Sequence, residues 1–146
     1  MKPNSNDAQE GSFLTERQLK VLHLRSRGCS QQEIADILGT TRSNISILEK
    51  RAHENIQKAE HTLQQWMMVR APISLKVSSG TDVFDIPDGI FKAADLKSIQ
   101  LPVTSLDIIT QLRLKAPQLF KKRSVPKDID IYITSEGELL IDERLR

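Results

Sequence analysis

Hydrophobic residues in the first part of the chain recur at helical spacing. One partly amphipathic run covers residues 16–27 and a shorter one covers residues 31–38, and each is followed by a glycine. Thr15 and Ser30 precede these runs, each with a Gln or Glu three positions later, which is the form of a capping box. The pattern therefore predicts two short helices separated by a tight connection.

A third helical pattern is much longer. Thr40 or Thr41 can cap it, and its apolar positions step by three or four residues until Pro72 forbids further helix. These positions are Ile45, Leu48, Ala52, Ile56, Ala59, Leu63 and Trp66. The spacing predicts one helix of about 29 residues, roughly 43 Å long. Its second half packs either on the C-terminal domain of the same chain or on a second chain.

Beyond Pro72 the apolar period changes from helical spacing to alternation, which is typical of strands. Glycine, proline and capping residues divide this part into short elements. The predicted elements are a strand over 73–77, another short strand over 81–86, a helix through about Leu96, a helix that Thr104 or Ser105 caps and Pro117 ends, and a hairpin over 129–133 and 139–141.

Residues 31–50, QQEIADILGTTRSNISILEK, are typical of a DNA-binding helix-turn-helix. Ala35 places a small residue where two helices approach, Gly39 lies where the chain must turn, and Ile45 fills the joint. A packed helical hairpin with no role in DNA binding is the alternative, but such a hairpin seldom matches all of these places.

In this motif the second helix enters the major groove by its N-terminal end. Burial of Ile45 and Leu48 leaves an outward face with five base-contact candidates, Arg42, Ser43, Asn44, Ser46 and Ile47. Arg42 suits guanine, Asn44 suits adenine and Ile47 suits the thymine methyl group, although an ordinary solvated position is the alternative for each polar residue. The phosphate-contact candidates are Ser30, Gln31, Gln32, Thr41, Lys50 and Arg51.

The fold class is therefore α+β, with an N-terminal all-α helix-turn-helix domain, a long connecting helix and a small C-terminal α+β domain whose sheet has three to five strands. The predicted divisions are a flexible lead-in over 1–12, the helix-turn-helix domain over 13–52, the connecting helix and candidate dimer seam over 53–71, and the C-terminal domain over 72–146.

The segment FLTERQLKVLHLRSRGCSQQEIADILGTTRSNISILEKRAHENIQKA resembles the helix-turn-helix shared by sigma-factor region 4 and many bacterial response regulators. Downstream, APISLKVSSGTDVFDIP and DIDIYITSEGELLI resemble the C-terminal part of the archaeal Tfx family of transcriptional regulators, so the resemblance runs from about Phe13 to Ile141. It implies sequence-specific DNA binding and regulation of transcription in an archaeal cytoplasm. The sigma-like alignment would place base readers at Arg42, Ser43, Ser46, Ile47 and Arg51.

Charge supports DNA binding only through its distribution. The whole chain has a formal charge of +2, whereas residues 12–51 hold seven Lys plus Arg against four Asp plus Glu, and residues 72–146 hold eleven of each. Because one short helix-turn-helix reads few base pairs, we expect a homodimer on double-stranded DNA. Contact with the transcription machinery is a further expectation for the C-terminal domain.

Two other functions compete with this interpretation. Catalysis is disfavoured because the three histidines lack zinc-hydrolase spacing, Cys29 is the single cysteine, and no nucleotide-binding glycine motif occurs, so no enzyme, metal or cofactor is predicted. A ligand-responsive regulator is the alternative, in which the C-terminal domain senses a small molecule or anion. Asp82, Asp85 and Asp88 lack the spacing of a calcium loop, and capping explains them better.

The strongest basic run outside the first domain is Lys121, Lys122 and Arg123. It suits DNA phosphates or an anionic effector, and a solvated loop is an equally good interpretation. No apolar run reaches the roughly 18 residues of a membrane-spanning helix, and the polar N-terminus lacks the apolar region of a signal peptide. We therefore expect a cytoplasmic protein without a membrane partner.

Overall fold

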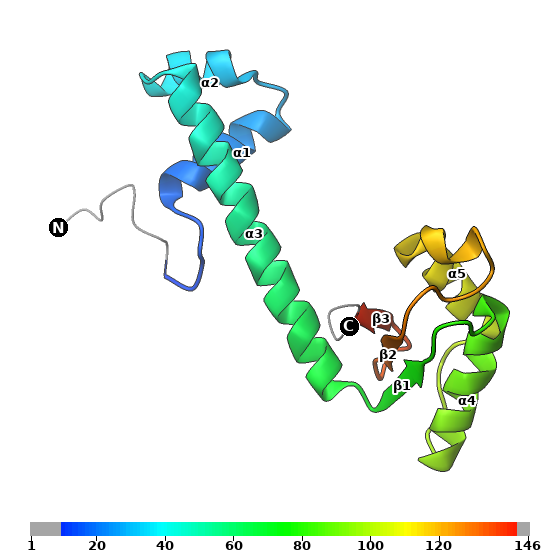
Figure 1. Ribbon diagram of the computed structural model, residues 1–146. Helices are drawn as coiled ribbons and strands as arrows, with labels where there is room; N and C mark the ends of the chain where they lie inside the picture. The colour runs from blue at the N-terminus through cyan, green and yellow to red at the C-terminus, as the bar shows by residue number, and fades with distance from the viewer. Residues whose placement is uncertain (1–9, 143–146) are drawn as a thin grey trace. The chain divides into compact units, whose positions relative to one another are not determined.

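The computed structural model describes residues 10–142, and the chain divides into two compact units, Met1–Leu63 and Gln64–Arg146. The first unit contains α1 (Glu16–Ser26), α2 (Gln31–Leu38) and most of α3 (Arg42–Arg70), which runs on into the second unit (Figure 1). These bounds confirm the three predicted helices. Most of the predicted lead-in over 1–12 lies outside the described residues. Within residues 10–142, no helix is both long and apolar enough to span a membrane.

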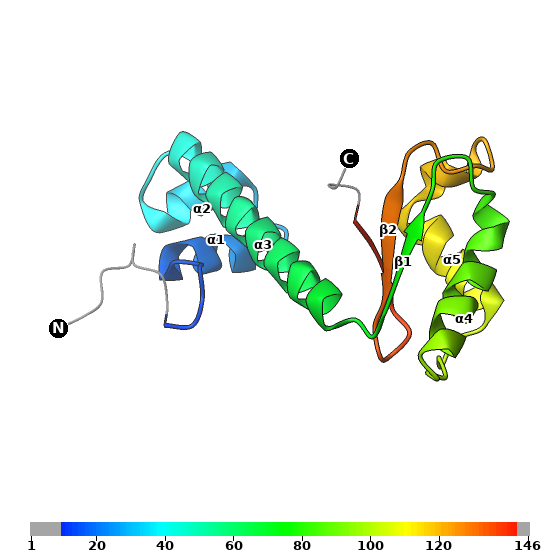
Figure 2. The same ribbon diagram turned by 60° about the horizontal axis from the view of Figure 1, so that its bottom comes forward.

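The second unit is the predicted small α+β domain. Its three strands form an antiparallel sheet in the order β1-β2-β3, and α4 and α5 lie against one face of that sheet (Figure 2). Its elements are β1 (Ile73–Val77), the 3-10 helix η1 (Val83–Asp85), α4 (Ile86–Leu96), α5 (Ser105–Lys115), the 3-10 helix η2 (Pro117–Phe120), β2 (Ile129–Ile133) and β3 (Leu139–Asp142). The predicted strand over 73–77, both helices and the terminal hairpin are confirmed.

The predicted strand over residues 81–86 is wrong. Asp82 forms only an isolated antiparallel bridge with Ser124, and the chain then turns through η1. The Asp82 Oδ1 atom accepts a hydrogen bond from the Phe84 N–H at 2.9 Å. A short polar side chain that bonds the backbone two residues on favours a turn over an extended strand. Capping, expected of this acidic cluster, is thus what Asp82 does.

Branched side chains fill the space between the sheet and its two helices. In the antiparallel register Ile73 pairs with Ile133 and Val77 pairs with Ile129, which puts all four side chains in the buried core. Ile90 of α4, like the strand residues a member of this core, is fully buried. Because strand side chains alternate between faces, this single register directs the apolar set of each strand toward the helices.

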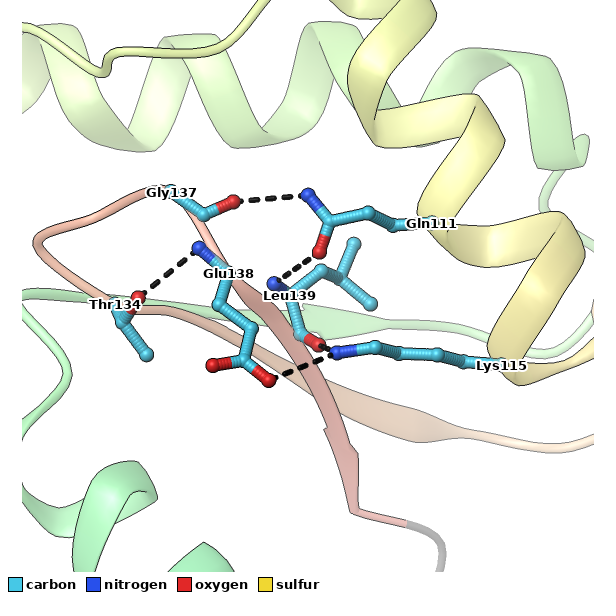
Figure 3. A network of polar contacts seen from close by, with 6 residues as sticks. All are labelled: Gln111, Lys115, Thr134, Gly137, Glu138 and Leu139. Carbon is cyan, nitrogen blue, oxygen red and sulfur yellow. Dashed lines mark hydrogen bonds and ion pairs between the residues drawn. The ribbon is translucent and has the colours of Figure 1, made fainter.

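Side chains of α5 hold the β2–β3 turn and the free edge of β3 (Figure 3). Gln111 Nε2 donates to the Gly137 carbonyl oxygen at 2.9 Å, and Gln111 Oε1 accepts from the Leu139 N–H at 2.8 Å. Lys115 Nζ donates to the Leu139 carbonyl oxygen and lies 3.4 Å from Glu138 Oε1. An edge strand exposes backbone groups that need partners. Gln111 and Lys115 therefore pair backbone groups at the edge of β3 that a fourth strand would otherwise pair.

The N-terminus of α5 is closed by a capping box. Thr104 Oγ1 accepts from the Asp107 N–H at 3.2 Å, and Asp107 Oδ2 accepts from the Thr104 N–H at 2.8 Å. The Thr104 backbone and side chain, both bonded to the carboxylate, hold the pKa of Asp107 below its ordinary value. Of the two predicted caps, Thr104 and Ser105, it is Thr104 that caps α5, and the helix therefore starts at Ser105.

The face that α3 presents changes along its length. Ile45 and Ala52 are buried, whereas Leu63 keeps 59% and Trp66 keeps 54% of its surface exposed. In the second unit, Met67 is half-buried and lines a hollow together with Thr134, which follows β2. The apolar stripe of α3 is thus buried at Ile45 and Ala52, half-buried at Ile56 and exposed at Ala59, Leu63 and Trp66.

Gly137 offers a stability test with a matched control. Its φ is +86°, and a Cβ there would lie 2.5 Å from Val103 Cγ1, while Gly80 has a φ of +89° and nothing within 4 Å of the same position. Gly80→Ala should cost roughly 1–2 kcal/mol from left-handed strain alone. Gly137→Ala should cost about 1–3 kcal/mol more because it adds a clash in a packed site. Urea unfolding of both variants measures the difference, and equal losses would contradict the clash.

Candidate nucleic-acid interface

Side-chain caps set the start of each helix in the first unit. Thr15 and Gln18 form the complete capping box at α1, with bonds of 3.0 and 3.1 Å. Ser30 Oγ accepts from the Glu33 N–H at 3.1 Å at the start of α2. Thr41 Oγ1 accepts from the Asn44 N–H at 3.2 Å at the start of α3. The start of α3 is therefore fixed by Thr41 rather than by Thr40.

The connection between α2 and α3 is a tight turn through Gly39. Its φ of +67° lies in the left-handed region that glycine adopts at low cost. The Thr40 N–H donates to the Ala35 carbonyl oxygen at 2.9 Å, which closes the C-terminus of α2. The glycine therefore lets the chain reverse within three residues, as a helix-turn-helix requires.

A small apolar cluster holds the three helices together. Val21, Ile34, Ala35 and Ile45 have no exposed surface, and half-buried side chains from Leu24, Cys29, Leu38 and Leu48 surround them. Ile45 of α3 and Ala35 of α2 thus pack at the joint between the helices, where the branched side chain of one and the small side chain of the other were predicted to lie. Burying Ile45 fixes which side of α3 faces inward, and hence which side faces solvent.

The predicted base-contact residues all lie exposed on the N-terminal turns of α3. They are Arg42, Ser43, Asn44, Ser46 and Ile47. Ile47 keeps 47% of its surface exposed, so its aliphatic side chain is open to contact from outside the unit. Asn44 Nδ2 already donates to Thr40 Oγ1 at 2.9 Å. That bond uses one of the two amide hydrogens of Asn44, so the second hydrogen and the oxygen can still contact a base.

The predicted phosphate-contact residues divide into two groups. Lys50 and Arg51 are exposed, in the third turn of α3. The residues at the start of α2 are engaged within the protein, because Ser30 caps the helix and Gln32 Nε2 donates to Asp36 Oδ1 at 3.0 Å. Gln31 Nε2 reaches Glu49 Oε2 at 3.5 Å. All of the predicted phosphate-contact residues therefore lie in the first unit, but the side chains of Ser30, Gln31 and Gln32 already bond to other groups of the protein.

A polar clasp of Arg25, Gln31 and Glu49 was missed by the sequence analysis. Arg25 Nε lies 3.1 Å from Glu49 Oε2, and an Arg25 terminal nitrogen donates to the Cys29 carbonyl oxygen at 3.1 Å. The clasp joins one residue from each of the three helices. Its members are 24 and 18 positions apart, so no local spacing rule connects them. One signal in the sequence could have found it, because Arg25 and Glu49 carry opposite charges and lie on either side of the predicted joint between the helices.

The first unit is a helix-turn-helix module, and comparisons with known proteins agree with this class. Residues 12–58 match the family described as sigma-70, region 4. Residues 59–141 match the family described as the C-terminal part of the DNA-binding protein TFX. The chain belongs to the Tfx family of DNA-binding transcriptional regulators, a class of proteins that is not an enzyme class.

Relatives that span nearly the whole chain come from archaea. A protein of Methanocaldococcus jannaschii named as a transcriptional regulatory protein is 46% identical over 130 residues, which are 89% of this chain and 95% of the relative. A similarly named protein of Pyrococcus abyssi is 46% identical over 134 residues, or 92% and 91% of the two chains. The DNA-binding protein Tfx of Methanothermobacter marburgensis is 34% identical over 131 residues, or 90% and 95%.

The clasp predicts a measurable coupling between Arg25 and Glu49. Their side chains are 42% and 16% exposed, so solvent screens the pair and its coupling should be about 0.2–1 kcal/mol. A double-mutant cycle of Arg25→Gln and Glu49→Gln, followed by urea unfolding, gives this value. The coupling should shrink as salt is raised.

Glu54 supplies the control for this cycle. It is exposed on the same helix, outside the clasp, so Arg25→Gln and Glu54→Gln should be additive. A coupling of the same size for both pairs would show that Arg25 feels the general charge of α3 rather than Glu49.

Proposed function

We propose that this chain binds duplex DNA in a sequence-specific manner by inserting the N-terminal turns of α3 into the major groove, and that it regulates transcription from the bound site. The observation that carries this proposal is the exposed row of polar and aliphatic side chains above the buried Ile45. In a helix-turn-helix, this end of the second helix is the one that reads base edges. The predicted division into lead-in, reading domain, connecting helix and C-terminal domain is part of the proposal.

Within the groove each side chain has a role that its chemistry defines. Arg42 donates two hydrogen bonds to guanine, and Ile47 contacts a thymine methyl group. Asn44 offers its oxygen and its second amide hydrogen to adenine, while Thr40 accepts the first hydrogen. Ser43 and Ser46 are short readers that accept several bases. The reading face therefore combines one strongly selective residue with permissive neighbours.

Phosphate contacts fix the register of the module on DNA. Lys50 and Arg51 are exposed and make no ion pair within residues 10–142, which makes them the strongest of the proposed phosphate contacts. Ser30, Gln31, Gln32 and Thr41 contribute through the helix starts on which they lie, where backbone N–H groups favour an anion. Gln31 must release Glu49 before its own side chain can reach a phosphate.

Arg42 and Lys50 should respond differently to truncation. Arg42→Ala should cost roughly 1–3 kcal/mol of binding and relax the preference at one base position, because it removes a base contact. Lys50→Ala should weaken all sequences alike and lower the salt slope by about one. Selection of sites from random DNA, followed by anisotropy titrations with each variant, measures both effects. Equal, sequence-blind losses would show that the assignment of readers is wrong.

The second half of α3 is proposed as the seam of a homodimer. Ala52, Ile56, Ala59, Leu63 and Trp66 follow the alternating steps of four and three that pair two helices. Leu63 and Trp66 are more than half exposed, although a stripe of this kind normally has a partner. A dimer would also double the number of base pairs that are read.

Sedimentation tests this seam. The wild-type chain should sediment as a dimer at micromolar concentration, and Leu63→Glu should shift it toward monomer because a charge cannot pack in an apolar seam. Gln57→Glu, exposed on the same helix but outside the stripe, should leave the dimer intact. A wild-type monomer, free and on DNA, would refute the seam.

The family assignment supports two further expectations. A regulator of transcription works where the genome lies, so we propose that the protein acts in an archaeal cytoplasm. Contact with the transcription machinery is proposed for the C-terminal unit, which carries no part of the reading face. No observation favours a sensed ligand over these roles.

A further inference from the structure

Positive charge is concentrated in one segment of the C-terminal unit. Residues 108–127 contain six cations and no acidic residue, although the predicted domain over 72–146 is neutral. The six are Arg113, Lys115, Lys121, Lys122, Arg123 and Lys127. Lys115 is engaged with Glu138 and Leu139, and Arg123 pairs with Asp82. Among residues 10–142 the other four cations make no ion pair.

Two phenylalanine rings bring these cations together. The Phe84 and Phe120 rings meet edge to face, with centroids 5.9 Å apart. The Arg113 guanidinium lies 4.7 Å from the centroid of Phe120, and the Arg123 guanidinium lies 5.0 Å from that of Phe84. Stacking holds each guanidinium in place, so less side-chain freedom is lost when it binds an anion. Lys121 and Lys122 follow Phe120 directly and are exposed.

The loop that carries these residues is held in a defined conformation. Arg123 has a φ of +59°, in the left-handed region that a residue with a side chain adopts only under constraint. The Val83 N–H donates to the Arg123 carbonyl oxygen at 2.9 Å, and the Val125 N–H donates to the Thr81 carbonyl oxygen at 2.9 Å. Asp82 Oδ2 accepts from Arg123 Nε at 2.9 Å. Hydrogen bonds that involve Val83, Val125 and Asp82 thus hold the loop that carries these cations in one conformation.

The charge of this surface stays positive after nearby acids are counted. Asp82 pairs with Arg123, whose side chain is nevertheless 69% exposed. Asp85 follows Phe84 in the sequence. Within residues 10–142, Lys121 and Lys122 make no ion pair. An anionic partner would therefore neutralise at least two unpaired charges.

We propose that this cationic patch, Arg113, Lys121, Lys122 and Arg123 around Phe84 and Phe120, binds phosphates of the DNA duplex held by the helix-turn-helix. Of the patch, Arg113, Lys121 and Lys122 make no ion pair among residues 10–142, and lysine, which is depleted at interfaces between proteins, is a standard phosphate contact. Once the first unit is bound, the tether keeps phosphates at high local concentration near the patch. The inference rests on the proposed function and adds a second, sequence-blind contact to it.

The salt dependence of binding tests the patch. Full-length wild type and Lys121→Gln/Lys122→Gln are titrated by anisotropy against a duplex selected from random DNA and a scrambled duplex, over several salt concentrations. Each lost phosphate contact should lower the slope of log K against log salt by about 0.9. The double variant should therefore lose nearly two from the slope, while its ratio of specific to scrambled affinity stays unchanged.

A matched control removes the same charge elsewhere. Lys92→Gln/Lys97→Gln on and beside α4 should keep the wild-type slope, and thermal melting verifies that both double variants are folded. A Lys121→Gln/Lys122→Gln slope equal to that of wild type overturns the patch and leaves an acidic protein surface as its partner class. Wild type that binds no selected duplex overturns the proposed function itself, which separates the two failures.

Discussion

The burial of Ile45 between α1 and α2 is the constraint on which the proposed reading face depends. Together with Ala52, which is also fully buried, Ile45 fixes the rotation of α3 about its own axis. Ser43 and Ile47 then face solvent because they lie on the other side of the same turns, and Arg42 is exposed at the first position of the helix. Val21, Ile34 and Ala35 complete the joint, and Gly39 lets the chain enter it from the required direction.

Electrostatics at this joint supports the apolar packing without replacing it. Arg25, Gln31 and Glu49 lie at the rim of the cluster, where the ion pair is screened and worth little by itself. Its value lies in geometry, since three side chains from three helices can meet only if the helices keep their angles. The same side chains also withdraw Glu49 from the reading side, where a carboxylate would repel phosphates.

Local rules predicted most of this structure, and the failures have a common cause. Caps at Thr15, Ser30 and Thr104 and the alternation in the hairpin depend on residues a few positions apart, so sequence spacing contains them. The clasp of Arg25 with Glu49, the hold of Gln111 on β3 and the ring pair of Phe84 with Phe120 join distant segments. Residues 81–86 look extended by composition, but Asp82 bonds Phe84 and turns the chain.

The continuity of α3 links the proposed reading face to the proposed seam. Successive residues of a helix turn by about 100°, so Ile45 and the later stripe through Leu63 lie on one side, while Ser43 and Ile47 lie on the opposite side. Two copies paired along this stripe would each keep Ser43 and Ile47 directed away from the partner. A single inserted residue between Ala52 and Ile56 would rotate the seam by about 100° relative to the reading face while leaving both intact. In such a proposed dimer the phase of α3 would set the spacing of the half-sites on DNA.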